Sequence, residues 1–78
     1  MPEFKYDLHS EVSVLSETDR GISTEVNIIS FNEGKRKLDI RKWDKKNDKM
    51  LKGIALSKAE ALLLYETLKE FDYSLLDD

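Results

Sequence analysis

Four alternate positions of a short stretch hold two cations, a carboxylate and an aromatic ring. These residues are Lys37, Arg41, Asp39 and Trp43. Alternate residues of a β-strand project from the same face of a sheet. In the preceding apolar stretch, Phe31 falls on the face opposite to Val26 and Ile28 and therefore shares a face with Trp43. Single-stranded nucleic acids stack their bases on aromatic side chains, while lysine and arginine neutralise their phosphates. The pattern thus predicts a single-stranded nucleic-acid-binding face on which Phe31 and Trp43 stack bases.

The basic residues of the chain are concentrated around this stretch. Residues 35–52 hold nine of the thirteen Lys and Arg residues and only three carboxylates, although the whole chain has a net charge of −3. Such a separation of charge can place a basic surface on an acidic protein. The residues expected to hold phosphates are Arg41, Lys37 and Lys52, with Lys35, Lys42 and Lys49 as weaker contacts. Charge alone also fits a lysine-rich hairpin that is merely solvated.

Alternatives remain for the aromatic residues and for the function. Phe31 and Trp43 could pack on each other or on the N-terminal segment, because aromatic residues in strands are more often packed than functional. The same face could anchor an acidic protein partner, in which case the chain would be a protein-interaction module. Single-stranded RNA differs from DNA as a ligand by its 2′-hydroxyl groups, so RNA stays an alternative to DNA.

The residue types needed for catalysis or metal binding are scarce. The chain has no cysteine, a single histidine (His9) and no glycine-rich phosphate loop. We therefore expect no enzymatic activity, no cofactor and no metal site. The N-terminus has no apolar run typical of a signal peptide, and no stretch approaches the length of a membrane span. These features predict a soluble, cytoplasmic protein without a membrane partner.

The length of 78 residues predicts one domain, residues 1–78. Alternating side chains predict three β-strands, and a fourth is expected after the third polar turn. These strands span about residues 4–15, 22–32, 36–43 and 49–54. Short polar turns separate them, and Gly34 is expected to take positive φ in the second turn. Ser57 and Glu60 have capping-box spacing, which predicts a helix at about 57–71. The fold class is therefore α+β, a curved four-stranded antiparallel meander followed by one C-terminal helix.

Two apolar surfaces are expected from these elements. The core face of the sheet is predicted to carry Val26, Ile28, Leu38 and Ile40. The helix has a wide apolar arc, because Leu62 and Leu63 extend its stripe. A chain this small buries a marginal core, and one without disulfides often gains stability by self-association. We therefore expect a homodimer in which the helix packs on a second copy, although the extra leucines could also fill a monomer core. The tail from residue 74 is expected to be loose.

The order of these motifs resembles the C-terminal domain of the transcriptional positive cofactor four family, and the whole chain is similar to its bacterial YdbC-type branch. The matching stretches are FNEGK (31–35), LDIRKW (38–43) and KGIALS (52–57). The resemblance implies a homodimer with helices at the interface and curved sheets that bind single-stranded DNA with little sequence preference. It also implies that Phe31 and Trp43 are the stacking residues and that Arg41 and Lys52 are matching cations. The implied setting is that of a bacterial, nucleoid-associated accessory factor of the transcription or replication machinery.

The chain departs from the eukaryotic pattern of that family at three places. The turn after Phe31 is one residue longer, and Trp43 stands alone where the family often has an aromatic pair. Asn27 and Ile29 stand in the second strand where the eukaryotic relatives have a cation. With fewer charges there, we expect stacking to contribute more to binding and salt-sensitive contacts to contribute less.

Overall fold

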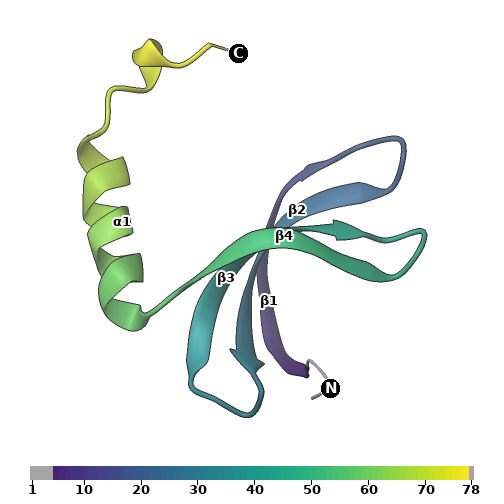
Figure 1. Cartoon of the computed structure of the whole chain (residues 1–78). Helices are drawn as coiled ribbons and strands as arrows, with labels where there is room; N and C mark the ends of the chain where they lie inside the picture. The colour runs from purple at the N-terminus through teal and green to yellow at the C-terminus, as the bar shows by residue number, and fades with distance from the viewer. Residues whose placement is uncertain (1–4, 78) are drawn as a thin grey trace.

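A computed structural model describes residues 5–77 of the chain. Its elements are β1 (Tyr6–Glu17), β2 (Ile22–Phe31), β3 (Arg36–Asp44), β4 (Lys49–Leu56), helix α1 (Lys58–Glu70) and the 3₁₀ helix η1 (Tyr73–Leu75) (Figure 1). The strands form one antiparallel sheet in the order β1-β2-β3-β4. The predicted α+β class, a four-stranded antiparallel sheet followed by one helix, is confirmed. The predicted start of the first strand, residue 4, lies outside the described residues.

The central pair of strands, β2 and β3, decides which side chains share a face. These strands pair without interruption, with Asp39 opposite Asn27 and Trp43 opposite Ser23. Residues at alternate positions of β2 add Phe31 to the same side. We call this side the inner face of the sheet. The alternation of the sequence predicted this grouping of Phe31, Asp39 and Trp43 correctly.

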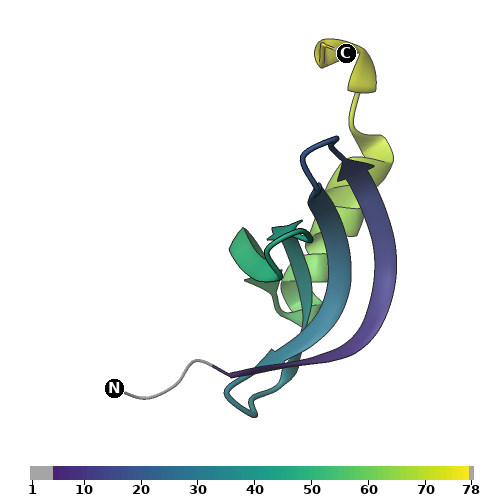
Figure 2. The ribbon, with the colours of Figure 1, turned by 90° about the vertical axis from the view of Figure 1, so that its right-hand side faces the viewer.

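The first strand, β1, is bent by irregular pairing with β2. Three register shifts interrupt the ladder. The residues left unpaired at these shifts are His9, Val12 and Leu15. Extra residues of this kind bend a strand and increase its twist, and Figure 2 shows the resulting arch of β1 and β2. The alternation expected through Val14 is therefore broken, and every residue of β1 is exposed.

The turn between β2 and β3 takes positive φ at other positions than expected. Asn32 and Glu33 have φ angles of 51° and 62°, and Gly34 does not have positive φ. The amide of Gly34 donates to the carbonyl of Phe31 over 2.9 Å, which makes Gly34 the last residue of the turn. Two central residues with positive φ suit the right-handed twist of the flanking strands. The prediction for Gly34 is wrong because the turn is centred on the two residues before it.

The apolar face of the sheet is not its buried face. The apolar face carries Val26, Ile28, Leu38 and Ile40, and all four are only half-buried. The helix α1 stands beside the sheet and contacts mainly β3 and β4 (Figure 1), so no described element of the chain covers the apolar face. The prediction that these four residues form the core is wrong for a single chain. The only buried apolar residue of residues 5–77 is Ile29, on the inner face.

The helix α1 begins as its sequence predicts and leaves its side chains exposed. The Oγ atom of Ser57 accepts from the amide of Glu60 over 3.2 Å, and the amide of Ser57 donates to the Glu60 carboxylate over 2.9 Å. This capping box fixes the first turn. All thirteen residues of α1 escape full burial, and Leu62 and Leu63 are 57% and 69% exposed. The part of the apolar arc formed by Leu62 and Leu63 is therefore not covered by the described residues.

The tail after α1 is more ordered than expected. The Tyr73 hydroxyl donates to the Leu68 carbonyl, and the rings of Phe71 and Tyr73 meet edge to face with centroids 5.1 Å apart. The Asp72 carboxylate caps η1 by accepting from the amide and hydroxyl of Ser74. These contacts and η1 give residues 72–75 a defined turn beyond the end of α1, while the side chains of Leu75 and Leu76 stay exposed.

Candidate nucleic-acid interface

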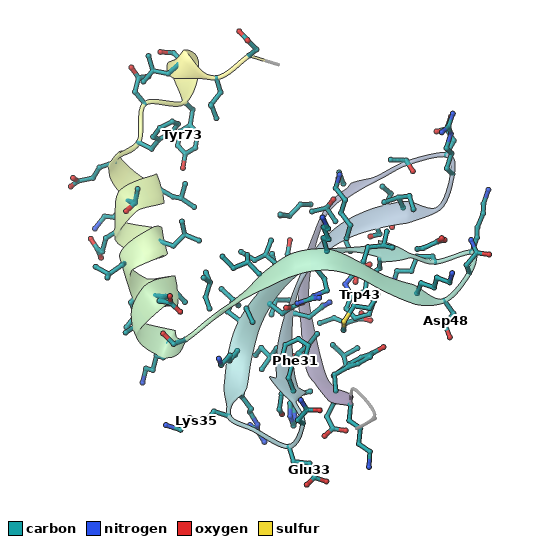
Figure 3. All side chains as sticks on the ribbon, viewed as in Figure 1. Phe31, Glu33, Lys35, Trp43, Asp48 and Tyr73 are labelled. Carbon is teal, nitrogen blue, oxygen red and sulfur yellow. The ribbon has the colours of Figure 1, made fainter. Side chains whose placement is uncertain are left out.

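The inner face of the sheet is concave and has a polar floor. Its buried floor residues are Ser23, Glu25, Asn27, Ile29 and Asp39. A hollow of about 200 Å³ lies between Tyr6 on β1 and Trp43 on β3. It shares Glu25 and Asn27 with a second hollow of about 420 Å³ that follows β1. Figure 3 shows Phe31 and Trp43 on this inner side, with Asp48 at the tip of the neighbouring β3–β4 hairpin.

The first aromatic residue, Phe31, is accompanied by a fixed cation. The Cζ atom of Arg41 lies 5.2 Å from the centroid of the Phe31 ring. The Nε and Nη2 atoms of Arg41 each donate to the Asp39 carboxylate over 2.6 Å, and Nη1 donates to the Leu51 carbonyl over 3.2 Å. Asp39 is fully buried, and the Arg41 side chain is 12% exposed. The buried carboxylate therefore holds the guanidinium against the ring.

The second aromatic residue, Trp43, has a similar arrangement. The Nζ atom of Lys45 lies 6.0 Å from the centroid of the Trp43 ring and 3.0 Å from the Glu25 carboxylate. Trp43 also meets the Tyr6 ring at a centroid distance of 5.8 Å and a tilt of 56°. The Nε1 atom of Trp43 is buried and has no acceptor among the described residues. Packing on the N-terminal strand, one of the two alternatives for Trp43, is thus present in the structure.

The Glu25 carboxylate is held ionised by its neighbours. Burial raises the pKa of Glu25, but hydrogen bonds from Ser23, Lys45 and Asn27 and the attraction of the Lys45 ammonium outweigh burial and lower it. The donors lie at 2.7 Å for the Ser23 hydroxyl and 3.3 Å for the Asn27 amide. The hydrogen bond to Glu25 in turn raises the pKa of Lys45, helped by the attraction of Glu11 and Glu17. The floor beside Trp43 is therefore anionic, with one cation bound to it.

The predicted phosphate-binding lysines lie at different places around the inner face. Lys37 is opposite Ile29 and belongs to that face, and Lys49 lines the hollow beside Trp43. Lys35 lies near the tip of the β2–β3 hairpin (Figure 3). Lys52 is in the irregular step of β4 between the residues that pair with Trp43 and with Arg41. All four are exposed.

One predicted contact is not brought together with the others. Lys42 pairs with Thr24, one position away from both Arg41 and Trp43, so it belongs to the face opposite to the inner one. There it lines a shallow depression with Arg20. Arg41 does lie on the inner face, but three of its N–H groups already have acceptors. Its remaining donors are therefore fewer than the sequence suggests.

Two further residues of the site were not predicted. Tyr6 falls within the strand predicted over 4–15 and was given no role, although it lies opposite Phe31 and contacts Trp43. Lys45 was assigned to a polar turn, although its ammonium is between Glu25 and the Trp43 ring. The alternation of Tyr6 with Leu8 is the one sequence signal that could have placed Tyr6 on the inner face. For Lys45 the sequence offers no comparable signal, because turn lysines are usually solvated.

Residues 5–77 contain neither a grouped set of metal ligands nor a membrane-spanning helix. No three His, Asp or Glu side chains in this range are grouped so that they could hold a metal ion. Within the same range, no helix has the length and apolar character needed to cross a membrane.

Comparison with known proteins places the chain in a family. The model of the family described as Transcriptional Coactivator p15 (PC4) matches residues 19–70, which include β2, β3, β4 and α1. An uncharacterized protein of Treponema pallidum (strain Nichols) is 36% identical over 66 residues, covering 85% of this chain and 78% of that protein. The family is known for single-stranded DNA binding and for transcription coactivation. The resemblance read from the three motifs is therefore confirmed, and the chain belongs to the transcriptional coactivator p15 (PC4) family.

Proposed function

We propose that this protein is a sequence-tolerant single-stranded DNA-binding protein without enzymatic activity, an accessory factor in transcription, replication or repair. The observation that carries the proposal is that Phe31 and Trp43 lie on one concave face, each with a cation beside its ring. A single strand laid along this face would meet aromatic rings with its bases and ammonium groups with its phosphates. We also predict that the protein belongs to the YdbC-type branch of the family and that its location is cytoplasmic and nucleoid-associated.

The roles within the site follow from the contacts of each residue. Phe31 and Trp43 stack bases, and Tyr6 supports the Trp43 ring from β1. Lys37 and Lys49 are exposed on the side of these rings and hold phosphates, as does Lys52, which is exposed in the irregular step of β4. Lys35 at the hairpin is a weaker contact. Arg41 positions Phe31 through its ion pair with Asp39, and its remaining N–H groups reach for a phosphate.

The proposed assembly is a homodimer. The apolar face of the sheet is half-exposed, and Leu62 and Leu63 of α1 are more than half exposed. Only one apolar residue among those described is buried. Leaving so much apolar area in water is costly for a domain of this kind. A second copy offers the same surfaces, and a two-fold arrangement covers both at once. Dimerisation would therefore supply the core that one chain lacks.

Binding is tested by fluorescence anisotropy with oligo-dT, oligo-rU and a duplex of equal length over a series of salt concentrations. We expect tight oligo-dT binding, weak duplex binding and quenching of Trp43 fluorescence. The double variant Phe31→Ala/Trp43→Ala should lose roughly 2–6 kcal/mol of binding free energy, the sum for two stacked bases. Tyr73→Ala serves as a matched control, since it removes a ring that lies on the tail next to α1. Unchanged affinity in the double variant would overturn the stacking role.

A protein-interaction module remains the second candidate function. It is favoured by the hollow beside Trp43, whose lining includes more carboxylates than ammonium groups. In that case Trp43 would anchor a protein partner, and oligo-dT, oligo-rU and duplex would bind equally weakly and only at low salt. Preference for oligo-rU over oligo-dT would instead assign the protein to single-stranded RNA.

A further inference from the structure

Charge is distributed unevenly across the sheet, from one edge strand to the other. The acidic edge is β1, which has Asp7, Glu11 and Glu17 and no lysine or arginine. The next strand, β2, has Glu25 as its one charged residue. The basic edge is β4, with Lys49 and Lys52 and no carboxylate. Because the spatial order is β1-β2-β3-β4, the charge of the sheet changes from negative to positive across its width.

The carboxylates on the acidic side line the concave surface itself. The larger hollow is bordered by Glu11, Glu17 and Glu25, and its one cation is Lys45 among the residues that line it. Glu25 binds that cation directly at 3.0 Å, so Lys45 compensates Glu25 and leaves the other two glutamates unbalanced. We name Glu11, Glu17 and Glu25 the acidic wall.

The acidic wall affects where a polyanion can lie. Phosphates and carboxylates repel each other over distances of the Debye length, about 10 Å at 0.1 M salt. The smaller hollow, which contains Trp43, also touches Glu11 and Glu25. A backbone over β1 would therefore pass above Glu11 and Glu17. A backbone over β3 and β4 would meet Lys37 and Lys49, with Asp44 and Asp48 only at the hairpin end of the smaller hollow.

We propose that the acidic wall confines the phosphate backbone of a bound single strand to the β3–β4 half of the inner face and turns the bases toward β1. This inference rests on the proposed single-stranded DNA binding and specifies its geometry. Phe31 and Trp43 are at the boundary between the two halves, so bases can reach their rings from the basic side. Glu11 and Glu17 are positioning residues, which limit the site by repulsion instead of touching the ligand.

The decisive experiment compares two variants, each of which loses two carboxylate charges, at different places in the protein. Glu11→Gln/Glu17→Gln neutralises exposed positions of the acidic wall, and Glu66→Gln/Glu70→Gln neutralises exposed positions of α1. Both variants change the net charge equally, so any difference between them is local. At about 50 mM salt the wall variant should bind oligo-dT about threefold to tenfold tighter than wild type, and clearly tighter than the helix variant. The difference should shrink at about 200 mM salt.

Two further ligands identify the origin of that gain. An oligo-dT with uncharged methylphosphonate linkages should bind the wall variant and the wild type equally, since it has no backbone charge to repel. In a length series of ordinary oligo-dT, the length beyond which affinity stops rising should be greater for the wall variant, because the strand can then spread over β1. Both results would support confinement of the backbone.

Each contrary outcome has a separate meaning. Equal gains in the wall and helix variants would show an effect of net charge alone and overturn the inference, as would a gain that persists with methylphosphonate linkages. An unchanged length limit would overturn the confinement. If wild type failed to bind oligo-dT at all, the proposed function itself would fail, and this result is distinct from the others.

Discussion

Gly53 lies directly opposite Arg41 in the β3–β4 ladder, and its lack of a side chain makes room for the Arg41 ion pair. A Cβ atom at Gly53 would be 1.9 Å from the Cβ of Arg41 and 2.6 Å from the Ile40 carbonyl oxygen. No side-chain movement relieves contacts of this length with atoms so close to the backbone. The glycine of the KGIALS motif therefore serves the inner face: it lets Arg41 bend onto Asp39 and lie against Phe31.

The substitution Gly53→Ala should accordingly destabilise the protein by about 1–3 kcal/mol, as expected when a packed site is overfilled. It should also weaken oligo-dT binding, because Arg41 and Phe31 shift together. Chemical denaturation and anisotropy titrations measure the two effects. Gly34→Ala is the control, since its added Cβ meets only the Phe31 carbonyl oxygen at 3.0 Å. Equal losses in the two variants would contradict the role given to Gly53.

The buried carboxylate of Asp39 should be the most sensitive polar position of the sheet. Asp39→Asn leaves Arg41 without its buried counter-charge, and breaking a buried pair costs about 3–5 kcal/mol. The variant should unfold at lower denaturant concentration and bind oligo-dT less tightly. Asp19→Asn makes the same chemical change at an exposed residue of the β1–β2 turn, outside the inner face, and should leave both properties unchanged. A small loss in Asp39→Asn, comparable with that control, would mean that water or other donors compensate Arg41.

Element order and strand pairing were predictable from the sequence, whereas burial was not. Alternation placed Phe31, Asp39 and Trp43 on one face, and the Ser57 capping signal fixed the start of α1. Alternation does not say which of two faces is covered. Here the apolar face depends on surfaces outside the single chain, while the inner face is buried by its own curvature and by the ion pair of Asp39 with Arg41.

The sequence predicted only those residues of the candidate site that strand alternation places on the inner face. Tyr6 comes to Trp43 through the pairing of β1, and three register shifts in β1 have no clear mark in the sequence. Glu25 reads as an ordinary surface residue, yet it is 5% exposed because Ser23 and Lys45 satisfy its carboxylate. Long-range contacts of this kind depend on the shape of the whole sheet, which no short motif specifies.

The stability contribution of Glu25 should depend on pH in a defined direction. The pKa of Glu25 is lowered in the folded protein from its ordinary value of 4.5, the net result of opposing burial and hydrogen bonds. A depressed pKa means that the ionised carboxylate stabilises the fold above pH 4.5, and that this contribution is lost as pH falls through the folded-state value. Glu25→Gln should therefore be less stable than wild type at pH 7, by about 1–3 kcal/mol.

Urea unfolding of wild type and Glu25→Gln at pH 7 and at several values below pH 4.5 measures this dependence. The difference between the two proteins should narrow steadily as the pH is lowered. Asp72→Asn is a useful comparison, because the pKa of Asp72 is also lowered by its hydrogen bonds to Ser74 but its carboxylate is on the exposed tail. A difference for Glu25→Gln that stays constant with pH would show that the charge of Glu25 is not what stabilises the floor.

The exposed leucines of α1 provide the test of self-association. Leu63 is 69% exposed in the single chain, so a charge there should cost little unless a second copy covers it. In the proposed homodimer, Leu63→Glu buries a carboxylate in an apolar interface, and the variant should run as a monomer in light scattering after size exclusion. Its unfolding midpoint should be lower than that of wild type and independent of protein concentration, whereas the wild-type midpoint rises with concentration.

Lys58→Glu adds the same side chain in the first turn of the same helix, where a carboxylate is favourable, and should stay dimeric. A monomeric wild type, or a Leu63→Glu variant that remains dimeric, would exclude α1 from the interface and leave the apolar face of the sheet as the surface to test next.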